Sequence, residues 1–220
     1  MIGEPLRYFI ACDFDGTITD EDTLDLLVQR FAPGVWESME AALLSGELSL
    51  TQVMEEEFRQ VRVTEREAVD YVLSRARVRH GFAEFVEWTS AQGHELVIVS
   101  AGIRTLIDPI LAAAGLPYLH IHAGDALLTT EGALFSFPPS SADCLDECGH
   151  CKRGTIRAHE PFPGPLVYVG DGFSDFCPAR EADIVFARAS LATHLEGEGV
   201  HFHPFEDFDT VTSVLDSLGA

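Results

Sequence analysis

The stretch FIACDFDGTITDED, residues 9–22, joins a short apolar run to a group of acidic side chains. The run before Asp13 is typical of a buried strand, and we predict one over Tyr8–Asp13. Asp13, Asp15 and the acids at 20–22 follow at once. Carboxylates this close repel one another and raise each other's pKa. A strand that ends in such a group therefore favours a site that holds a cation.

Five further segments have the same short apolar character, and helical patterns lie between most of them. Strands that alternate with helices form a parallel sheet covered on both faces, so we predict an α/β fold. The further strands are expected at Leu96–Ser100, Leu119–His122, Leu166–Gly170, Ile184–Ala187 and Val200–His203. The clearest helices are expected at Gly81–Ala91, Arg104–Ala114 and Lys152–His159.

Residues 21–78 interrupt this alternation, because they contain helical patterns and no strand. We therefore predict a helical insertion at 21–78 between two parts of a core, residues 1–20 and 79–220. Weak alternation around Glu131–Gly132 predicts a β-hairpin near 125–137. The inserted helices are expected at Glu21–Phe31, Val35–Leu44, Leu50–Val61 and Thr64–Arg77.

The composition is that of a globular protein with an acidic surface. The formal net charge is −22 over 220 residues. This charge argues against a nucleic-acid partner, because phosphate contacts need clustered Lys and Arg. No apolar run approaches the roughly 20 residues of a membrane span, and no secretory signal is evident. We expect a cytoplasmic protein without a membrane partner, and the sequence carries no indication of its oligomeric state.

Polar side chains follow several predicted strands at their carboxyl ends, where sites form in open α/β sheets. Carboxylate oxygens suit Mg²⁺, and the N–H groups of a turn that leads into a helix can hold phosphate oxygens. These residues together indicate a phosphoryl-transfer site that binds Mg²⁺. They are Asp13 and Asp15 after the first strand, Ser100, Ala101 and Gly102 after the second, Asp171 and Asp175 after the fourth, and Lys152 at a helix start.

The chain resembles the phosphatases of the haloacid dehalogenase superfamily. The matching pieces are DFDGT (13–17), VIVSAG (97–102), Lys152 in CKRGT, and GDGFSD (170–175), and they span nearly the whole chain in the family order. The resemblance implies a Rossmann-like core with an α-helical cap inserted after the first motif, in agreement with the insertion at 21–78. The hairpin near 125–137 is similar to the small flap of phosphoserine phosphatase-like members.

The same resemblance implies a role for each matching residue. Asp13 is expected as the nucleophile that forms an aspartyl-phosphate. Asp15 is expected to protonate the leaving alkoxide and then to activate water. Asp171 would bind Mg²⁺ together with Asp13 and the Asp15 carbonyl group, and Asp175 would support the metal directly or through water. The phosphoryl group would be bound by Ser100, Ala101, Gly102 and Lys152.

Four local segments narrow the family further. FAPGVWESM (31–39) and CLDECGHCKRG (144–154) look like the methionine-salvage phosphatases that act on 2-hydroxy-3-keto-5-methylthiopentenyl-1-phosphate, and residues 186–191 and 201–208 resemble their C-terminal region. The same lineage includes phosphoserine phosphatases and phosphoethanolamine/phosphocholine phosphatases, so the expected substrate is a small phosphate ester of one of these kinds. The sequence also leaves open a phosphotransferase or a binding module without catalysis.

Two expectations concern residues outside the four motifs. In phosphoserine phosphatases an acid just after the first motif contacts the substrate amine. Glu21 or Asp20 is the candidate here, although Asp20 is more typical of a helix N-cap. Cys144, Cys148 and Cys151 have a C-x3-C-x2-C spacing and are candidate ligands of a structural Zn²⁺. The alternatives are free thiols or one reversible disulfide, which the spacing favours because three cysteines do not form the usual paired pattern of zinc ligands.

Overall fold

The computed structural model describes residues 6–35, 39, 41–43, 45–138 and 149–219. A seven-stranded sheet of order β4-β3-β2-β1-β5-β6-β7 crosses the molecule, and only the β3–β4 pair in it is antiparallel. The predicted α/β fold with a parallel sheet is therefore confirmed. The strands are β1 (Phe9–Cys12), β2 (Glu95–Ile103), β3 (His120–Thr129), β4 (Gly132–Ser136), β5 (Leu166–Gly170), β6 (Ile184–Ala187) and β7 (His203–Pro204).

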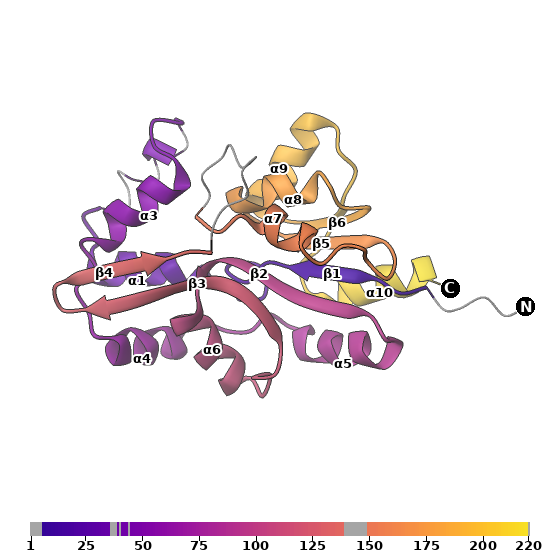
Figure 1. The fold of residues 1–220 in the computed structure, drawn as a ribbon, viewed down its shortest axis with the longest axis horizontal. Helices are drawn as coiled ribbons and strands as arrows, with labels where there is room; N and C mark the ends of the chain where they lie inside the picture. The colour runs from indigo at the N-terminus through magenta and orange to yellow at the C-terminus, as the bar shows by residue number, and fades with distance from the viewer. Residues whose placement is uncertain (1–5, 36–38, 40, 44, 139–148, 220) are drawn as a thin grey trace, which may run out of the picture.

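Helices cover both faces of this sheet, with α7, α8 and α9 on one face and α4, α5 and α6 on the other (Figure 1). A short 3-10 helix, η1 (Phe173–Asp175), follows β5. The helices are α1 (Thr23–Phe31), α3 (Leu50–Phe58), α4 (Glu65–Arg75), α5 (Phe82–Gln92), α6 (Arg104–Ala113), α7 (Lys152–Arg157), α8 (Phe176–Ala179), α9 (Ala189–Glu198) and α10 (Phe208–Gly219).

Strand β1 lies in the middle of the sheet, between β2 and β5, and its side chains are completely buried. Successive side chains of a strand point to opposite faces. Ile10 and Cys12 accordingly join the apolar cluster under α5, α6 and α10, whereas Phe9 and Ala11 join the cluster under α7 and α9. Burial on both faces explains the uninterrupted apolar run before Asp13. It also fixes the carboxyl end of β1 beside those of its two neighbours.

One strand prediction was wrong and another was incomplete. The strand expected at Val200–His203 is found at His203–Pro204, because the Val200 N–H group bonds to the Leu195 carbonyl group at the end of α9. Strand β3 continues from the segment expected at 119–122 directly into the expected hairpin. Its first part pairs with β2 in parallel, and Asp125–Thr129 pairs with β4 in antiparallel fashion. The hairpin is therefore an extension of the central sheet.

The helices between β1 and β2 pack against this extension. Phe58 of α3 meets Phe135 of β4 edge-on, with ring centroids 4.6 Å apart, and the Val63 N–H group donates to the Thr129 carbonyl group at 3.2 Å. One continuous apolar cluster joins residues of α1, α3 and α4 to the core strands. Thr64 and Glu67 form a capping box at the start of α4.

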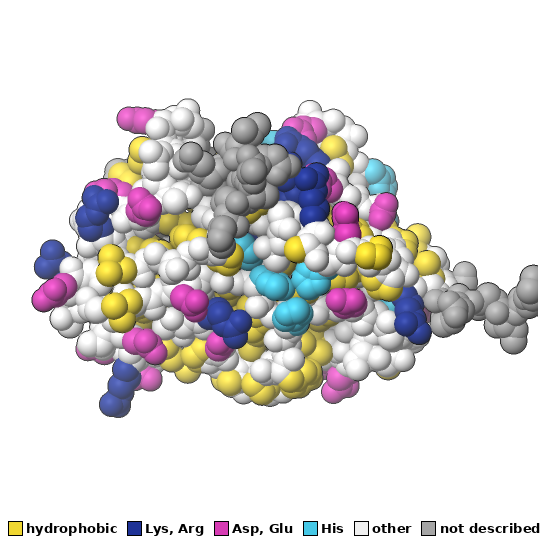
Figure 2. All heavy atoms as spheres, viewed as in Figure 1, with side chains coloured by type: hydrophobic (Ala, Val, Ile, Leu, Met, Phe, Trp, Pro, Cys, Tyr) yellow, Lys and Arg dark blue, Asp and Glu magenta, His cyan; other side chains and the backbone are white. Residues whose placement is uncertain are grey.

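Half of the helix predicted over 35–44 falls on residues outside the described ranges, and the described residues 39 and 41–43 are helical. Within those ranges, no helix is long and apolar enough to cross a membrane. On the face shown in Figure 2, acidic and basic side chains are interspersed, and several histidines gather near its centre. Ring contacts join His120, His122 and His159 into one such cluster.

Candidate active site

The loop after β1 is held from both sides. The Asp13 N–H group donates to the Val169 carbonyl group of β5 at 2.9 Å, so the Asp13 side chain is fixed at the edge of the sheet. Arg79 is almost completely buried, and its guanidinium group donates to the carbonyl groups of Gly16, Thr17 and Thr19 at 2.7–2.9 Å. These bonds keep the loop that carries Asp15 in one conformation.

Lys152 is the single lysine of the chain, and α7 places it under the tip of β1. Its ammonium group donates to Asp13 Oδ1 at 2.5 Å and to Asp175 Oδ1 at 2.6 Å. Burial alone would lower the pKa of Lys152, but the charges of Asp13 and Asp175 outweigh it and raise the pKa above its ordinary value. Lys152 is therefore a fixed positive charge between two carboxylates.

Asp175 accepts four hydrogen bonds and is completely buried. Its Oδ1 atom accepts from Lys152 and from the Tyr168 hydroxyl group, and its Oδ2 atom accepts from the N–H groups of Asp171 and Gly172 at 2.9 and 2.8 Å. Both oxygens of the carboxylate are thus used by the protein. Asp175 orients Lys152 and the start of the Asp171 loop at the same time.

Asp171 and Asp13 lie together at the edge of the cavity. Asp171 accepts a hydrogen bond from the Thr17 hydroxyl group at 2.7 Å, and burial followed by the charge of Asp175 raises its pKa to about 6. Burial, followed by the charges of its acidic neighbours, raises the pKa of Asp13 well above its usual value, against the effect of Lys152. A bound cation would lower both pKa values.

Asp13, Asp171 and Asp175 each have a carboxylate oxygen within 4.8 Å of the others, and they are the one group of three potential metal-ligating side chains found in the described ranges. All the donors are oxygens, which suits Mg²⁺. The raised pKa values of Asp13 and Asp171 are a second sign of fit, because burial and neighbouring acids outweigh the effect of Lys152 on both carboxylates. The saturated hydrogen bonds of Asp175 make it a support for the other two.

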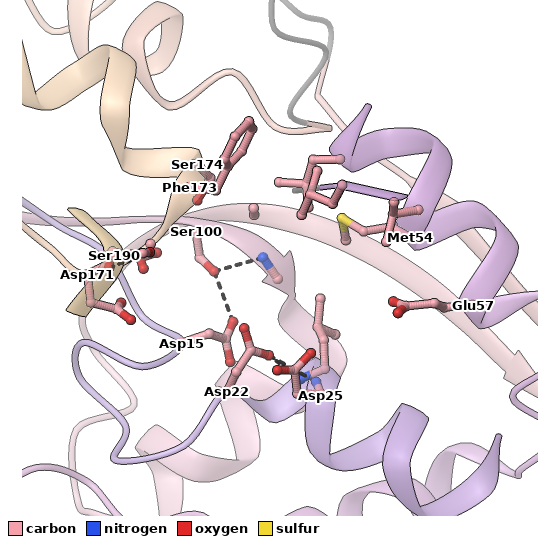
Figure 3. A pocket seen from close by; sticks show the side chains of 18 of the residues that line it. Asp15, Asp22, Asp25, Met54, Glu57, Ser100, Asp171, Phe173, Ser174 and Ser190 are labelled. Carbon is pink, nitrogen blue, oxygen red and sulfur yellow. Dashed lines mark hydrogen bonds between the residues drawn. The ribbon is translucent and has the colours of Figure 1, made fainter. Parts of the chain in front are cut away.

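In the view of Figure 3, Asp15 lies between Asp171 and Asp22. Its Oδ1 atom accepts from the N–H and hydroxyl groups of Thr23, and its Oδ2 atom accepts from the Ser100 hydroxyl group at 3.3 Å. Burial raises its pKa, although these hydrogen bonds oppose the shift. The Gly102 N–H group donates to Ser100 Oγ at 2.8 Å. A Cβ atom at Gly102 would collide with the Asp15 carboxylate, so the close approach requires glycine.

The acids at 20–22 are arranged differently from the prediction. Asp22, not Asp20, is the N-cap of α1, and its side chain accepts from the N–H groups of Leu24 and Asp25. Asp20 forms an ion pair with Arg79 at 3.2 Å. Glu21 is exposed and does not line the cavity. The structure therefore gives no support to Glu21 or Asp20 as a substrate contact, because the turn before α1 points Asp22 inward instead.

The cysteine prediction falls mainly outside the described ranges, since Cys144 and Cys148 belong to residues 139–148. Cys151 is the N-cap of α7, and its sulfur accepts from the Gly154 N–H group. The neighbouring His150 is buried and bonds to the Ser100 carbonyl group and the Thr155 hydroxyl group. His150 thus supports the last part of β2 at Ser100, and zinc binding stays a hypothesis.

A cavity of about 500 Å³ opens above these groups. Its floor contains Asp13, Asp15, Ser100, Ala101, Gly102 and Asp171. The opposite wall comes from α1 and α3 and combines apolar side chains with three further acids, Asp22, Asp25 and Glu57. The sequence-based prediction missed Asp25 and Glu57 entirely. The sequence pattern could have identified Glu57, because this charged residue interrupts the apolar stripe of α3 formed by Leu50, Val53, Met54 and Phe58.

A family model described as haloacid dehalogenase-like hydrolase matches residues 10–180, which is well over half of the chain. The chain belongs to the haloacid dehalogenase-like hydrolase family. This hydrolase is 32% identical over 214 residues to the 2-hydroxy-3-keto-5-methylthiopentenyl-1-phosphate phosphatase of Brevibacillus brevis, and the match covers 96% of both chains. It is also 32% identical over 208 residues to the enzyme of that name from an Exiguobacterium species, covering 94% of this chain and 96% of the relative.

The fold of the hydrolase is also that of solved phosphoserine phosphatases. A phospho-aspartyl intermediate analogue of phosphoserine phosphatase matches with a TM-score of 0.70 at 18% identity, over 95% of this chain and 99% of the other. A substrate-bound phosphoserine phosphatase matches equally well, with a TM-score of 0.70. At this identity the likeness concerns the fold alone. Family and curated relatives together make the protein a phosphoric monoester hydrolase.

Proposed function

We propose that the protein is a Mg²⁺-dependent phosphomonoesterase that hydrolyses a small phosphorylated metabolite through an aspartyl-phosphate on Asp13. The observation that carries this proposal is the placement of Asp13, Asp15 and Asp171 around the floor of one cavity, with Lys152 bonded to Asp13. Each group has a different environment, and different environments give neighbouring carboxylates different roles.

Asp13 and Asp171 would hold Mg²⁺, with the Asp15 carbonyl group as a further ligand and Asp175 in support. When bound, Mg²⁺ supplies positive charge that stabilises the phosphoryl oxygens and keeps the acids ionised. The side chain of Asp15 is bonded to Thr23 and Ser100, which is compatible with a metal contact through its carbonyl group alone. Lys152 would hold one oxygen of Asp13 and leave the other for attack.

The reaction would use Asp13 and Asp15 in sequence. A carboxylate oxygen of Asp13 forms the bond to phosphorus while the ester P–O bond breaks, and Asp15 gives its proton to the departing alkoxide. Asp15 then takes a proton from water, which attacks the aspartyl-phosphate and releases phosphate and free Asp13. The raised pKa of buried Asp15 favours the protonated form that the first step needs.

Ser100, Ala101 and Gly102 would bind the phosphoryl oxygens where β2 ends and α6 begins. Ser100 is completely buried, with its hydroxyl group between Asp15 and the Gly102 N–H group. Lys152 would add a fixed charge beneath them. This placement supports phosphate at the floor of the cavity and the remainder of the substrate against α1 and α3.

For the substrate itself we propose 2-hydroxy-3-keto-5-methylthiopentenyl-1-phosphate, which the curated relatives are named for. The apolar wall formed by Leu24, Leu50, Val53, Met54 and Phe58 supports this choice, because it suits the apolar methylthio end. Phosphoserine and phosphoethanolamine are the competing substrates to test.

We also propose that residues 21–78 act as the cap over a core of residues 1–20 and 79–220, with the hairpin near 125–137 as a flap beside the cap. The contact of Phe58 with Phe135 joins the proposed cap to the proposed flap. The cytoplasm is the proposed location.

The test is the release of inorganic phosphate from a panel that holds the enol phosphate, phosphoserine, phosphoethanolamine and p-nitrophenyl phosphate. We expect the highest kcat/KM for the enol phosphate, complete loss with EDTA, and recovery when Mg²⁺ is added. Phosphate found on a second substrate instead of in solution would indicate a phosphotransferase. No turnover of any ester with Mg²⁺ present would leave only a binding module.

A further inference from the structure

Helix α3 presents an apolar face to the cavity, and one charged residue interrupts it. Leu50, Val53 and Met54 lie at helical spacing along this face, and Glu57 continues the same stripe. Residues at i, i+3, i+4 and i+7 share one side of a helix. A glutamate in that position loses hydration on folding, so its presence there calls for a function.

Glu57 is only 8% exposed, and its carboxyl group points from α3 toward the middle of the cavity (Figure 3). No group in the described part of the chain donates a hydrogen bond to it. Burial, followed by the nearby charge of Asp25, raises the pKa of Glu57 to about 7. Near neutral pH the group therefore exists in both forms and can either donate or accept a hydrogen bond.

The charges around Glu57 are all of one sign. Among the described residues that line the cavity there are six acids and no lysine or arginine. The residues outside the described ranges contain no lysine or arginine either. Lys152 is buried beneath the floor between two carboxylates. A substrate carboxylate in this cavity would therefore meet acids and no unengaged positive charge.

We propose that Glu57 is the specificity-determining group of a head-group subsite, where its carboxyl group hydrogen-bonds to an uncharged hydroxyl or carbonyl oxygen of the substrate. The subsite selects phosphate esters whose remainder is uncharged and partly apolar, and it rejects esters that carry a carboxylate. This inference rests on the proposed phosphatase function and names the part of the substrate that Glu57 recognises.

The apolar surroundings of Glu57 favour an uncharged partner over an ammonium group. Leu50, Val53, Met54 and Phe58 belong to the same helix as Glu57 and line the same cavity. An ammonium ion placed against this surface would lose its hydration to apolar side chains, with Glu57 and the nearby Asp25 as its replacement partners. A hydroxyl or keto oxygen loses far less, and the apolar side chains pack against the carbon skeleton.

The experiment compares Glu57→Leu, Glu57→Arg and the wild type, with Glu55→Gln as control, because Glu55 is exposed on the same helix. The probes are the enol phosphate, phosphoserine, phosphoethanolamine and p-nitrophenyl phosphate, all with Mg²⁺. We expect Glu57→Leu to lower the kcat/KM ratio of the enol phosphate to p-nitrophenyl phosphate about 10-fold or more, mainly through KM. Glu57→Arg should raise kcat/KM for phosphoserine about 10-fold. Glu55→Gln should leave every ratio unchanged.

Three results would overturn the inference. The first is a wild type that prefers phosphoserine or phosphoethanolamine, the second is a Glu57→Leu variant with unchanged ratios, and the third is a Glu57→Arg variant without gain on phosphoserine. In each case turnover of p-nitrophenyl phosphate shows that the phosphatase function itself stands. If the folded wild type hydrolyses no ester at all, both proposals fail together.

Discussion

The carboxylates near the cavity floor and the carboxylate of Glu57 on the α3 wall differ in how many hydrogen bonds they accept from the protein. Beneath the floor, Asp175 accepts four hydrogen bonds, and on the floor Asp15 accepts three. On the α3 wall, Glu57 is buried but accepts none from the described part of the chain. Groups that must hold one geometry during chemistry are fixed by the protein. The group proposed to meet the substrate is left for the substrate to complete.

The largest effect is expected at Asp13 on the floor. Asp13→Asn keeps the shape of the side chain but removes the nucleophilic oxygen charge, so kcat should fall by at least about 10⁴-fold. Phosphate release and the circular dichroism spectrum are the measurements. Asp70→Asn, on the exposed face of α4, is the matched control and should keep full activity. Activity retained by Asp13→Asn would refute the nucleophile and with it the contrast between floor and wall.

The next effect concerns the loop that carries Asp15. Arg79→Met leaves the carbonyl groups of Gly16, Thr17 and Thr19 without their donor, and we expect the free energy of unfolding to fall by about 2–4 kcal/mol. Urea unfolding measures the change. Arg77→Met is the control, because Arg77 is exposed and bonds only to nearby carbonyl groups, and its effect should stay below about 0.5 kcal/mol.

A smaller effect is expected from the supporting bonds of Asp175. Asp175→Asn replaces one accepting oxygen by an NH₂ group. This group can only donate, so it cannot accept the hydrogen bonds from the backbone N–H groups or from the Lys152 ammonium group that the oxygen accepted. We expect kcat/KM to fall about 10–100-fold and the Mg²⁺ concentration for half activity to rise. Tyr168→Phe removes one of the four donors and should cost less than about 10-fold. Equal losses in both variants would mean that Tyr168, rather than the whole network, orients Lys152.

The smallest expected effect is the pH dependence of stability that Glu57 causes. Its pKa rises from 4.5 to about 7 on folding, so the folded protein binds this proton more tightly than the unfolded chain. The contribution of protonated Glu57 to the stability of the folded protein is therefore complete below pH 4.5, and it is lost as the pH rises through about 7. Because glutamine cannot ionise, the free energy of unfolding of Glu57→Gln should rise relative to that of the wild type by about 1–3 kcal/mol between pH 5 and pH 8. Thermal unfolding without substrate measures this difference. A pH-independent difference, or the same gain in Glu55→Gln, would contradict it.

Much of the fold and the floor of the site is readable from the sequence alone. The apolar run before Asp13 has to be buried on both faces, and strands that alternate with helices have to form a parallel sheet. The sheet then brings Asp13, Ser100 and Asp171 to one edge, as their positions after three strands predict. These features depend on local sequence patterns and on the order of strands and helices, so the sequence is sufficient to predict them.

Only the tertiary structure decided the details that depend on contacts between distant segments. Asp22 rather than Asp20 caps α1, since the turn after Thr19 is pinned by Arg79. Strand β3 runs on into the hairpin because its second half finds a partner in β4 and support from Phe58. The apolar stripe that contains Glu57 can be recognised in the sequence, but only the packing of α3 in the folded protein decides that this stripe lines the cavity. The role of Glu57 depends on a cavity that α1, α3 and the sheet create together.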